Sequence, residues 1–280
     1  MVAIGNGIGL PFLKGVGGAG DTPVFIDAWQ AATGDVMGDA QKTVVSDTLE
    51  LLRGFGTPNG SNLINKFSGT NSVILPYVPK DDSTAYLSGY ALDLLTGNTV
   101  VTWYNFVPAN CQPGGMAGSG YGVLNVQPAD FGQDDIMAGY YFIAYNSASI
   151  NDRILGTPRL FTNSKNSGGR QPTQFNSTTR TDFTGLSPVG VNAINRNSSS
   201  QVEKYVNGSL VQTLSAGSTT PESLDIFLYD QNNGSGLPSG KRNRDTVGGW
   251  FFGVSLNANE MEDLHFAIQY LNDNIITGGR

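Results

Sequence analysis

The chain has 280 residues, of which 37 are glycine and only 14% are charged, with 16 basic against 23 acidic residues and a net charge of −7. This composition is typical of a turn-rich, all-β protein and differs from that of a charge-rich helical one. The sequence has no stripe dense in lysine and arginine, so a nucleic-acid partner is not expected. No apolar run is long enough to span a bilayer, and the first fifteen residues lack the pattern of a signal peptide. We therefore expect synthesis in the cytoplasm and no membrane partner. A single cysteine, Cys111, cannot form an internal disulfide.

Residues 1–20 form a glycine-rich segment with isolated apolar side chains. Glycine removes most local backbone preference, so this segment cannot bury its apolar residues alone. One interpretation is a loose chain end. The other is a docking arm that orders on a partner, with Ile8, Leu10 and Phe12 as anchors. The apolar anchors favour the arm, because a solvated tail would be more polar.

Residues 21–60 show helical periodicity. Apolar residues cluster in 24–31, and Thr43–Phe55 carries an i, i+1, i+4, i+5, i+8 stripe. Gly54 and Gly56 are C-terminal stop signals. The segment is a small helical subdomain, a neck between arm and head, or an oligomerisation helix.

From residue 61 onward, the pattern is that of β-strands separated by turn residues. Pro76 interrupts the first strand and places it at an edge or a bulge. Residues 162–182 are polar and predict either a long loop or a pair of weak edge strands. Strands are expected within 71–78, 90–95, 100–107, 140–145, 154–161, 190–195, 201–215, 224–229 and 250–254.

The segment 201–215 predicts a hairpin, because Asn207-Gly208 suits the positive φ angles of a type I′ turn. With this turn, Tyr205 faces Leu210, and Leu214 lies on the same side of the hairpin. Both sides of the hairpin carry apolar groups. We therefore expect it inside a sandwich rather than at an exposed edge.

The final segment predicts a helix. Asn257 and Glu260 have the spacing of a capping box, and an apolar stripe follows with helical period. Gly278-Gly279 would end the helix. Many short strands closed by one helix predict a β-sandwich with an appended helix.

Three motifs then occur in order: YVNGSLVQTLS (205–215), SLDIFLYDQNNG (223–234) and WFFGVSLNANEMEDLHFAIQYLNDNI (250–275). They resemble the C-terminal half of laminin-G-like (concanavalin A-like) jelly rolls, in the variety found in structural proteins of tailed bacteriophages. Residues 32–56 are similar to the helical element that precedes the jelly roll in those proteins, and their N-termini also carry glycine-rich arms. The resemblance covers about residues 25–280. The positions that approximate the closing pattern are Gly253, Leu256, Asn257, Glu260, Tyr270 and Leu271.

The resemblance implies a mainly-β jelly-roll sandwich with a C-terminal helix and a short N-terminal helical segment. It divides the chain into an arm (1–20), a helical neck (21–60) and a head (61–280). It implies a virion component, as a fibre, tail or head appendage, that docks to other virion proteins through the arm. The head would contact host-surface glycans. Such a protein is expected as a homo-oligomer, with a trimer as the natural form of a fibre. The alternative is a purely structural decoration protein of the capsid, neck or tail, without a ligand.

Catalytic signals are sparse. The only histidine, His265, lies in the predicted terminal helix, and its neighbours favour a structural role. No nucleophile-elbow, phosphate-loop or zinc-protease motif is present. A glycosidase needs two carboxylates about 5 to 9 Å apart, and no strand carries acids with that spacing. We therefore expect no enzyme, and rank a carbohydrate-active enzyme behind both binding and structural roles.

Glycan recognition needs aromatic faces with Asn, Asp and Arg at loop rims. Two loops qualify, one after Tyr229 and one around Lys241, Arg242 and Arg244, although a structural role competes at each position. The acidic groups near residues 230–234 and Asp134-Asp135 also offer oxygen ligands for a loop-bound calcium, without EF-hand spacing. No other metal or cofactor is expected. The candidate ligand-binding residues are Trp103, Tyr229, Asp230, Asn232, Asn233 and Arg244.

Overall fold

The computed structural model describes residues 23–78, 89–106, 111–112, 115–117, 120–146, 152–163, 165, 168–185, 189–240 and 242–275. The proposed arm anchors Ile8, Leu10 and Phe12 lie outside these residues, as does Lys241. None of the described helices is both long and apolar enough to cross a membrane. The helices are α1 (Val24–Thr33), α2 (Asp39–Leu52), α3 (Leu63–Phe67) and α5 (Ala258–Ile275).

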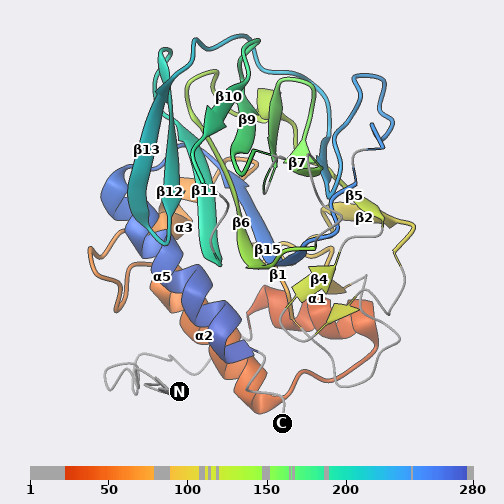
Figure 1. Ribbon diagram of the computed structural model, residues 1–280. Coiled ribbons are helices and arrows are strands. Elements are labelled where there is room, and N and C mark those ends of the chain that lie inside the picture. The colour runs from red at the N-terminus through yellow and green to blue at the C-terminus, as the bar shows by residue number, and fades with distance from the viewer. Residues whose placement is uncertain are drawn as a thin grey trace, which may run out of the picture.

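Two antiparallel sheets face each other (Figure 1). The larger has the order β13-β12-β11-β6-β15-β4-β3, and β1 also pairs with β15. Its strands are β1 (Val73–Pro76), β3 (Cys111–Gln112), β4 (Gly115–Ala117), β6 (Ile136–Ala144), β11 (Gly190–Arg196), β12 (Gln201–Val206), β13 (Ser209–Ser215) and β15 (Thr246–Gly253).

The second sheet has seven strands in the order β10-β9-β8-β7-β14-β5-β2. The polar segment 162–182 belongs to it and contains two of its strands, β9 and the edge strand β10. Its strands are β2 (Val101–Tyr104), β5 (Tyr121–Leu124), β7 (Arg153–Gly156), β8 (Leu160–Asn163), β9 (Gln171–Phe175), β10 (Thr181–Phe183) and β14 (Ile226–Leu228).

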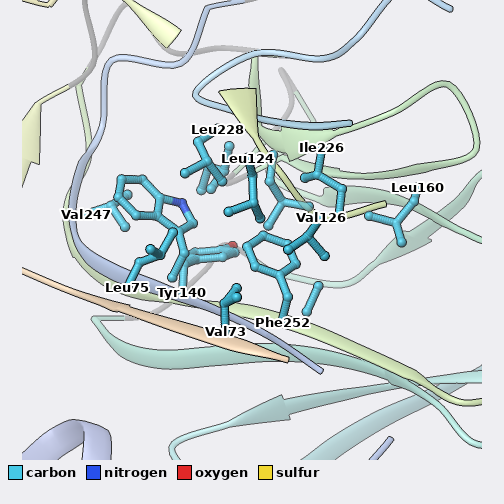
Figure 2. Close-up of a cluster of buried hydrophobic side chains, with 14 of the residues drawn as sticks. Val73, Leu75, Leu124, Val126, Tyr140, Leu160, Ile226, Leu228, Val247 and Phe252 are labelled. Carbon is cyan, nitrogen blue, oxygen red and sulfur yellow. The ribbon is translucent and has the colours of Figure 1, made fainter. Parts of the chain in front are cut away.

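The main core lies between the sheets. In Figure 2, Val73, Tyr140 and Phe252 of the larger sheet point toward Leu124 and Leu228 of the smaller one. Alternate residues of each strand supply this layer, as expected for a sandwich. The mainly-β jelly-roll sandwich with a C-terminal helix and N-terminal helical segment is confirmed.

A second apolar layer covers the outer face of the larger sheet. Helices α2 and α5 run side by side along it (Figure 1), and the Tyr270 hydroxyl of α5 donates to Asp47 Oδ2 of α2 over 2.8 Å. Met261, Leu264 and Leu271 of α5 share this cluster with buried residues of α1 and α2. Helix α2 therefore packs onto the sandwich beside α5, α1 packs against Gly89 and Gly97, and the domain boundary at residue 60 stays a prediction.

The cap of α5 is confirmed. The Glu260 amide donates to Asn257 Oδ1 over 3.1 Å, and the Asn257 amide donates to Glu260 Oε2 over 2.8 Å. These reciprocal bonds satisfy donors that have no partner within the first helical turn.

The hairpin at Asn207-Gly208 is confirmed, but two details of it are corrected. Tyr205 faces Leu210 as predicted, whereas Leu214 pairs with Val202 and packs toward the main core. The register shifts after Lys204, and a bulge of one residue reverses the facing of everything beyond it. The hairpin also lies at an edge, since β13 ends the larger sheet.

The expected strand at 90–95 is not formed. The structure has only an isolated bridge between Leu92 and Thr99 there. The segment still contacts β1, because the Asp93 carboxylate accepts from the Ile74 amide and the Leu94 amide donates to the Ile74 carbonyl, each over 2.8 Å.

Candidate functional site

The two loops singled out in the sequence lie side by side at one end of the sandwich. One follows β14 and the other leads into β15, and Figure 1 shows this part of the chain beside β5 and β2. The Asn243 amide donates to the Tyr229 carbonyl over 2.8 Å, and Arg242 forms an isolated β-bridge with Arg153 at the start of β7. The fold therefore brings Asp230 and the arginine loop together, although they are separate in sequence.

Asp230 is a buried residue that holds the two loops together. It is fully buried, and its Oδ1 accepts from the Gln231 amide and the Ser239 hydroxyl, each over 2.7 Å. Its Oδ2 lies 3.9 Å from Arg242 Nε. The carboxylate thus fixes both loops and positions Arg242, and its burial keeps it from a ligand.

The two asparagines of the first loop shape its turns. Asn232 is buried, and its Oδ1 accepts from the amides of Gly234 and Gly236 over 3.0 and 3.1 Å. Asn233 is exposed, and its Oδ1 accepts from the Ser235 amide over 2.9 Å. Such local side-chain bonds stabilise tight turns. Of this pair, only Asn233 reaches the surface.

Trp103 and Tyr229 are corrected to core residues. Tyr229 is fully buried, with its ring centroid 5.0 Å from Trp250 and 5.5 Å from Phe106. Trp103 packs partly buried against the same cluster, 5.1 Å from Phe106. Strand alternation turns Trp103 inward and its neighbour Tyr104 outward.

Tyr104 is the aromatic residue at the surface that sequence reasoning missed. It is 43% exposed and stacks on Tyr121, with ring centroids 5.0 Å apart and planes at 13°. Tyr121 stacks in turn on Phe227 at 5.3 Å, and the Arg242 guanidinium lies 5.9 Å from the Tyr121 ring. The pattern that could have found Tyr104 is the alternation of β2, once Trp103 is assigned to the core.

Arg153 is a buried cation beneath the loops. Its guanidinium lies 3.7 Å from the Phe161 ring centroid and donates to Gln231 Oε1 over 3.1 Å and to Asn163 Oδ1. Burial, with a smaller effect of nearby Arg180, lowers the pKa of Arg153 to about 10. It therefore remains positively charged at neutral pH.

Asp152 and Arg244 are two further charged residues at this end of the sandwich. Burial raises the pKa of the Asp152 carboxyl, the charge of Arg244 opposes this, and Asp245 and Asp230 add to the rise. Arg244 is exposed, whereas Asp245 is buried and accepts from the Asn146 amide over 2.6 Å. Buried Asp230 thus lies beside the half-buried Arg242, and Asp152 is close enough to Arg244 for that charge to affect its pKa. We call the group formed by Tyr104, Tyr121, Asp152, Arg242 and Arg244 the rim site.

A loop-bound calcium stays a prediction at the two loops considered for it. No group of three or more His, Cys, Asp or Glu side chains suited to a metal occurs within the described parts of the chain. Asp230 is committed to the loop and to Arg242, and Asp135 Oδ1 accepts from the Ser255 amide and hydroxyl over 2.8 and 2.7 Å.

No protein-family model matches the chain, and no curated protein matches its sequence. Solved structures of a sialidase from Trypanosoma rangeli share the fold. Its complex with 2,3-difluorosialic acid, a covalent intermediate, gives a TM-score of 0.52 at 15% identity, covering 84% of this chain and 39% of that chain. A mutant displaying trans-sialidase activity gives 0.51 at 14%, covering 85% and 38%. The chain thus spans 38–39% of the length of these sialidases, and the likeness shows the fold alone.

These structures correct the expectation that the chain is not an enzyme. That expectation rested on a lone helical histidine, on the lack of familiar motifs and on the lack of suitably spaced carboxylates. The fold is found within sialidases, which are enzymes, so these arguments do not exclude catalysis.

Proposed function

We propose that the chain is a carbohydrate-binding protein of a bacteriophage virion, whose rim site binds acidic glycans on the host surface. The arm at residues 1–20 would dock it to other virion proteins, as a fibre, tail or head appendage. Display as a homo-oligomer, such as a trimer, would turn weak single contacts into firm adhesion through effective concentration.

The observation that carries glycan binding is the Tyr104–Tyr121 stack beside Arg242. Aromatic faces pack against the apolar faces of sugar rings, and guanidinium groups bind carboxylates through paired hydrogen bonds. Arg242 lies beside the buried Asp230, which preorganises this arginine, and the exposed Arg244 adds a second positive charge near Asp152. The preference for acidic sugars rests on these arginines and not on the sialidases, which share the fold only.

The virion setting rests on the motif resemblance at residues 205–275 and on the glycine-rich arm. Removal of residues 1–20 should abolish incorporation into particles and leave the head folded. The protein composition of particles, measured by mass spectrometry, tests this prediction. Normal incorporation of the shortened chain would contradict the docking role of residues 1–20.

The second candidate is a purely structural decoration protein. The exposed edge strand β13 favours it, because Leu210 and Val211 are 49% and 53% exposed and the strand carries no charge. Uncharged edge strands are ready-made surfaces for neighbouring subunits.

A glycan array separates the two candidates. Wild type should bind acidic glycans, and Tyr104→Ala and Arg242→Gln should each weaken this binding by about tenfold, equivalent to about 1.4 kcal/mol. The matched controls are Phe55→Ala and Arg53→Gln, an exposed aromatic and an exposed arginine just after α2, and both should bind like wild type.

Absence of binding by wild type to every glycan would favour the decoration protein. Equal losses in the controls would remove the rim site from the proposal. Bound glycans should be recovered intact, as checked by mass spectrometry, and cleaved products would replace adhesion with hydrolysis as the activity.

A further inference from the structure

A hollow of about 620 Å³ lies at the end of the sandwich opposite the rim site. The segment before β1, the turn at 93–99, and the chain from the end of β5 to Asp130 line it. The rim site adjoins the start of β15 at Thr246, whereas Ser72 of the hollow lies against Gly253 at its end. Strand β2 joins the two, since Val100 of the hollow comes just before the strand and Tyr104 of the rim site ends it, a separation of roughly 13 Å along the strand.

Hydrogen bonds within the protein hold the walls of the hollow in place. Asp93 is buried and accepts from the amides of Ile74 and Thr96 over 2.8 and 3.1 Å, and from the Thr96 hydroxyl over 2.7 Å. The Asn125 amide donates to the Val100 carbonyl over 2.8 Å. A preorganised wall loses little entropy when a ligand binds.

Four other polar side chains of the lining are, by contrast, uncommitted. Asn71, Asn98 and Asn125 come from three separate segments and are all exposed. Their side-chain amides make no hydrogen bond to any described residue, and neither does the hydroxyl of Thr99. Each amide offers two donors and an acceptor with two lone pairs. Three such groups around one hollow match a ligand with many hydroxyl groups.

The charge of the hollow selects against anions. Its lining contains Asp93 and Asp130 and no lysine or arginine. Val100, which is half-buried, supplies apolar surface next to the amides, whereas Val73 and Val126 are buried and belong to the main core. The volume falls within the range of about 300–1,000 Å³ typical of small-molecule sites.

We propose that this hollow is a second binding site, for a neutral saccharide. Amides and one hydroxyl bind the sugar hydroxyls, Val100 contacts the ring carbons, and the carboxylates exclude acidic sugars. The site is independent of the rim site in position and in charge preference, and does not rest on the proposed function.

To test this proposal, the full chain is titrated with neutral mono- and oligosaccharides of glucose, galactose, mannose and N-acetylglucosamine. Binding is measured by calorimetry and saturation-transfer NMR. The double variant Asn98→Ala/Asn125→Ala should lose at least about tenfold in affinity for the neutral sugar that binds wild type. Its melting temperature should stay at the wild-type value, since neither side chain holds a described bond. Asn65→Ala, an exposed asparagine outside the lining, is the matched control and should bind normally.

The rim variants Tyr104→Ala and Arg242→Gln should keep neutral-sugar binding, and the double variant should keep acidic-glycan binding. This crossed pattern separates failure of the hollow from failure of the rim site. The proposal is overturned if no neutral sugar binds wild type, or if the rim variants lose the neutral sugar while the asparagine variant keeps it.

Discussion

Asp263 shows how one side chain ties remote segments together. It is buried on α5, where Oδ2 accepts from the Ser61 amide over 2.7 Å and Oδ1 accepts from the Asn59 amide over 2.9 Å. Burial raises its pKa, but the hydrogen bonds from Ser61 and Asn59 outweigh this, and the net pKa is lowered. The carboxylate form is therefore the one that the folded state prefers.

This lowered pKa predicts a loss of stability in acid. The folded state binds fewer protons than the unfolded state near the ordinary pKa of 3.8, so the contribution of Asp263 is fully present above that pH. It disappears as the pH falls through the folded pKa. Asp263→Asn should lower the free energy of unfolding by about 1–3 kcal/mol at pH 7, and by less at pH 3, where wild type has lost part of the same contribution.

Urea unfolding at both pH values measures this difference. The exposed Asp27→Asn in α1 is the control, expected within about 0.5 kcal/mol of wild type. An Asp263→Asn deficit that stays constant from pH 7 to pH 3 would contradict the linkage.

Among the elements, the β12–β13 hairpin docks its turn directly on α5. Gly208 has φ +78°, and a Cβ there would lie 3.0 Å from Glu262 Cα and 3.1 Å from His265 Cβ. Glycine thus serves both the turn geometry and the close approach of the helix.

Substitution at Gly208 should separate these two roles. Gly236 has a similar φ of +75°, but a Cβ there would have no atom within 4 Å, so Gly236→Ala tests backbone strain alone. We expect Gly236→Ala to cost about 1 kcal/mol, and Gly208→Ala at least about 1 kcal/mol more, because α5 must shift. Thermal unfolding of both variants measures these losses of stability. Equal losses would show that the contact of residue 208 with α5 contributes nothing to stability.

Sequence patterns predict the elements well where periodicity is strong. The α5 cap, the Asn-Gly turn and the two N-terminal helices follow from local chemistry, and all are found. The bulge after Lys204 leaves no signal in the local sequence, so the sequence-based prediction put Leu214 on the wrong side of the hairpin. The outward orientation of Tyr104 was missed for another reason, because the two faces of a strand cannot be assigned until the layer that it packs against is known. The hollow joins three distant segments and has no contiguous motif.

At the scale of the whole molecule, α5 is part of the fold and not a surface appendage. Its buried residues join the apolar layer on the outer face of the larger sheet, and α2 packs beside it there. A chain without residues 23–60 would expose buried groups of α5, including Leu264 and Leu271.

We therefore expect deletion of residues 23–60 to abolish cooperative unfolding and to increase binding of a hydrophobic dye. Deletion of residues 1–20 is the control and should leave the melting temperature unchanged. Calorimetry checks both, and a wild-type transition in the first variant would show that α1 and α2 are dispensable for the sandwich.

The position of β15 has a consequence for how the protein is made. This strand lies between β6 on one side and β1 and β4 on the other, with Trp250 opposite Tyr140, yet it is the last of the described strands along the chain. Until it has been synthesised, the nine residues of β6 have one backbone edge unpaired and their apolar side chains uncovered. The larger sheet is therefore completed only after β15 has been made, and such long-range pairing is slow. Chains that stop before β15 lack a central strand of the larger sheet, so we expect them to aggregate or to be degraded.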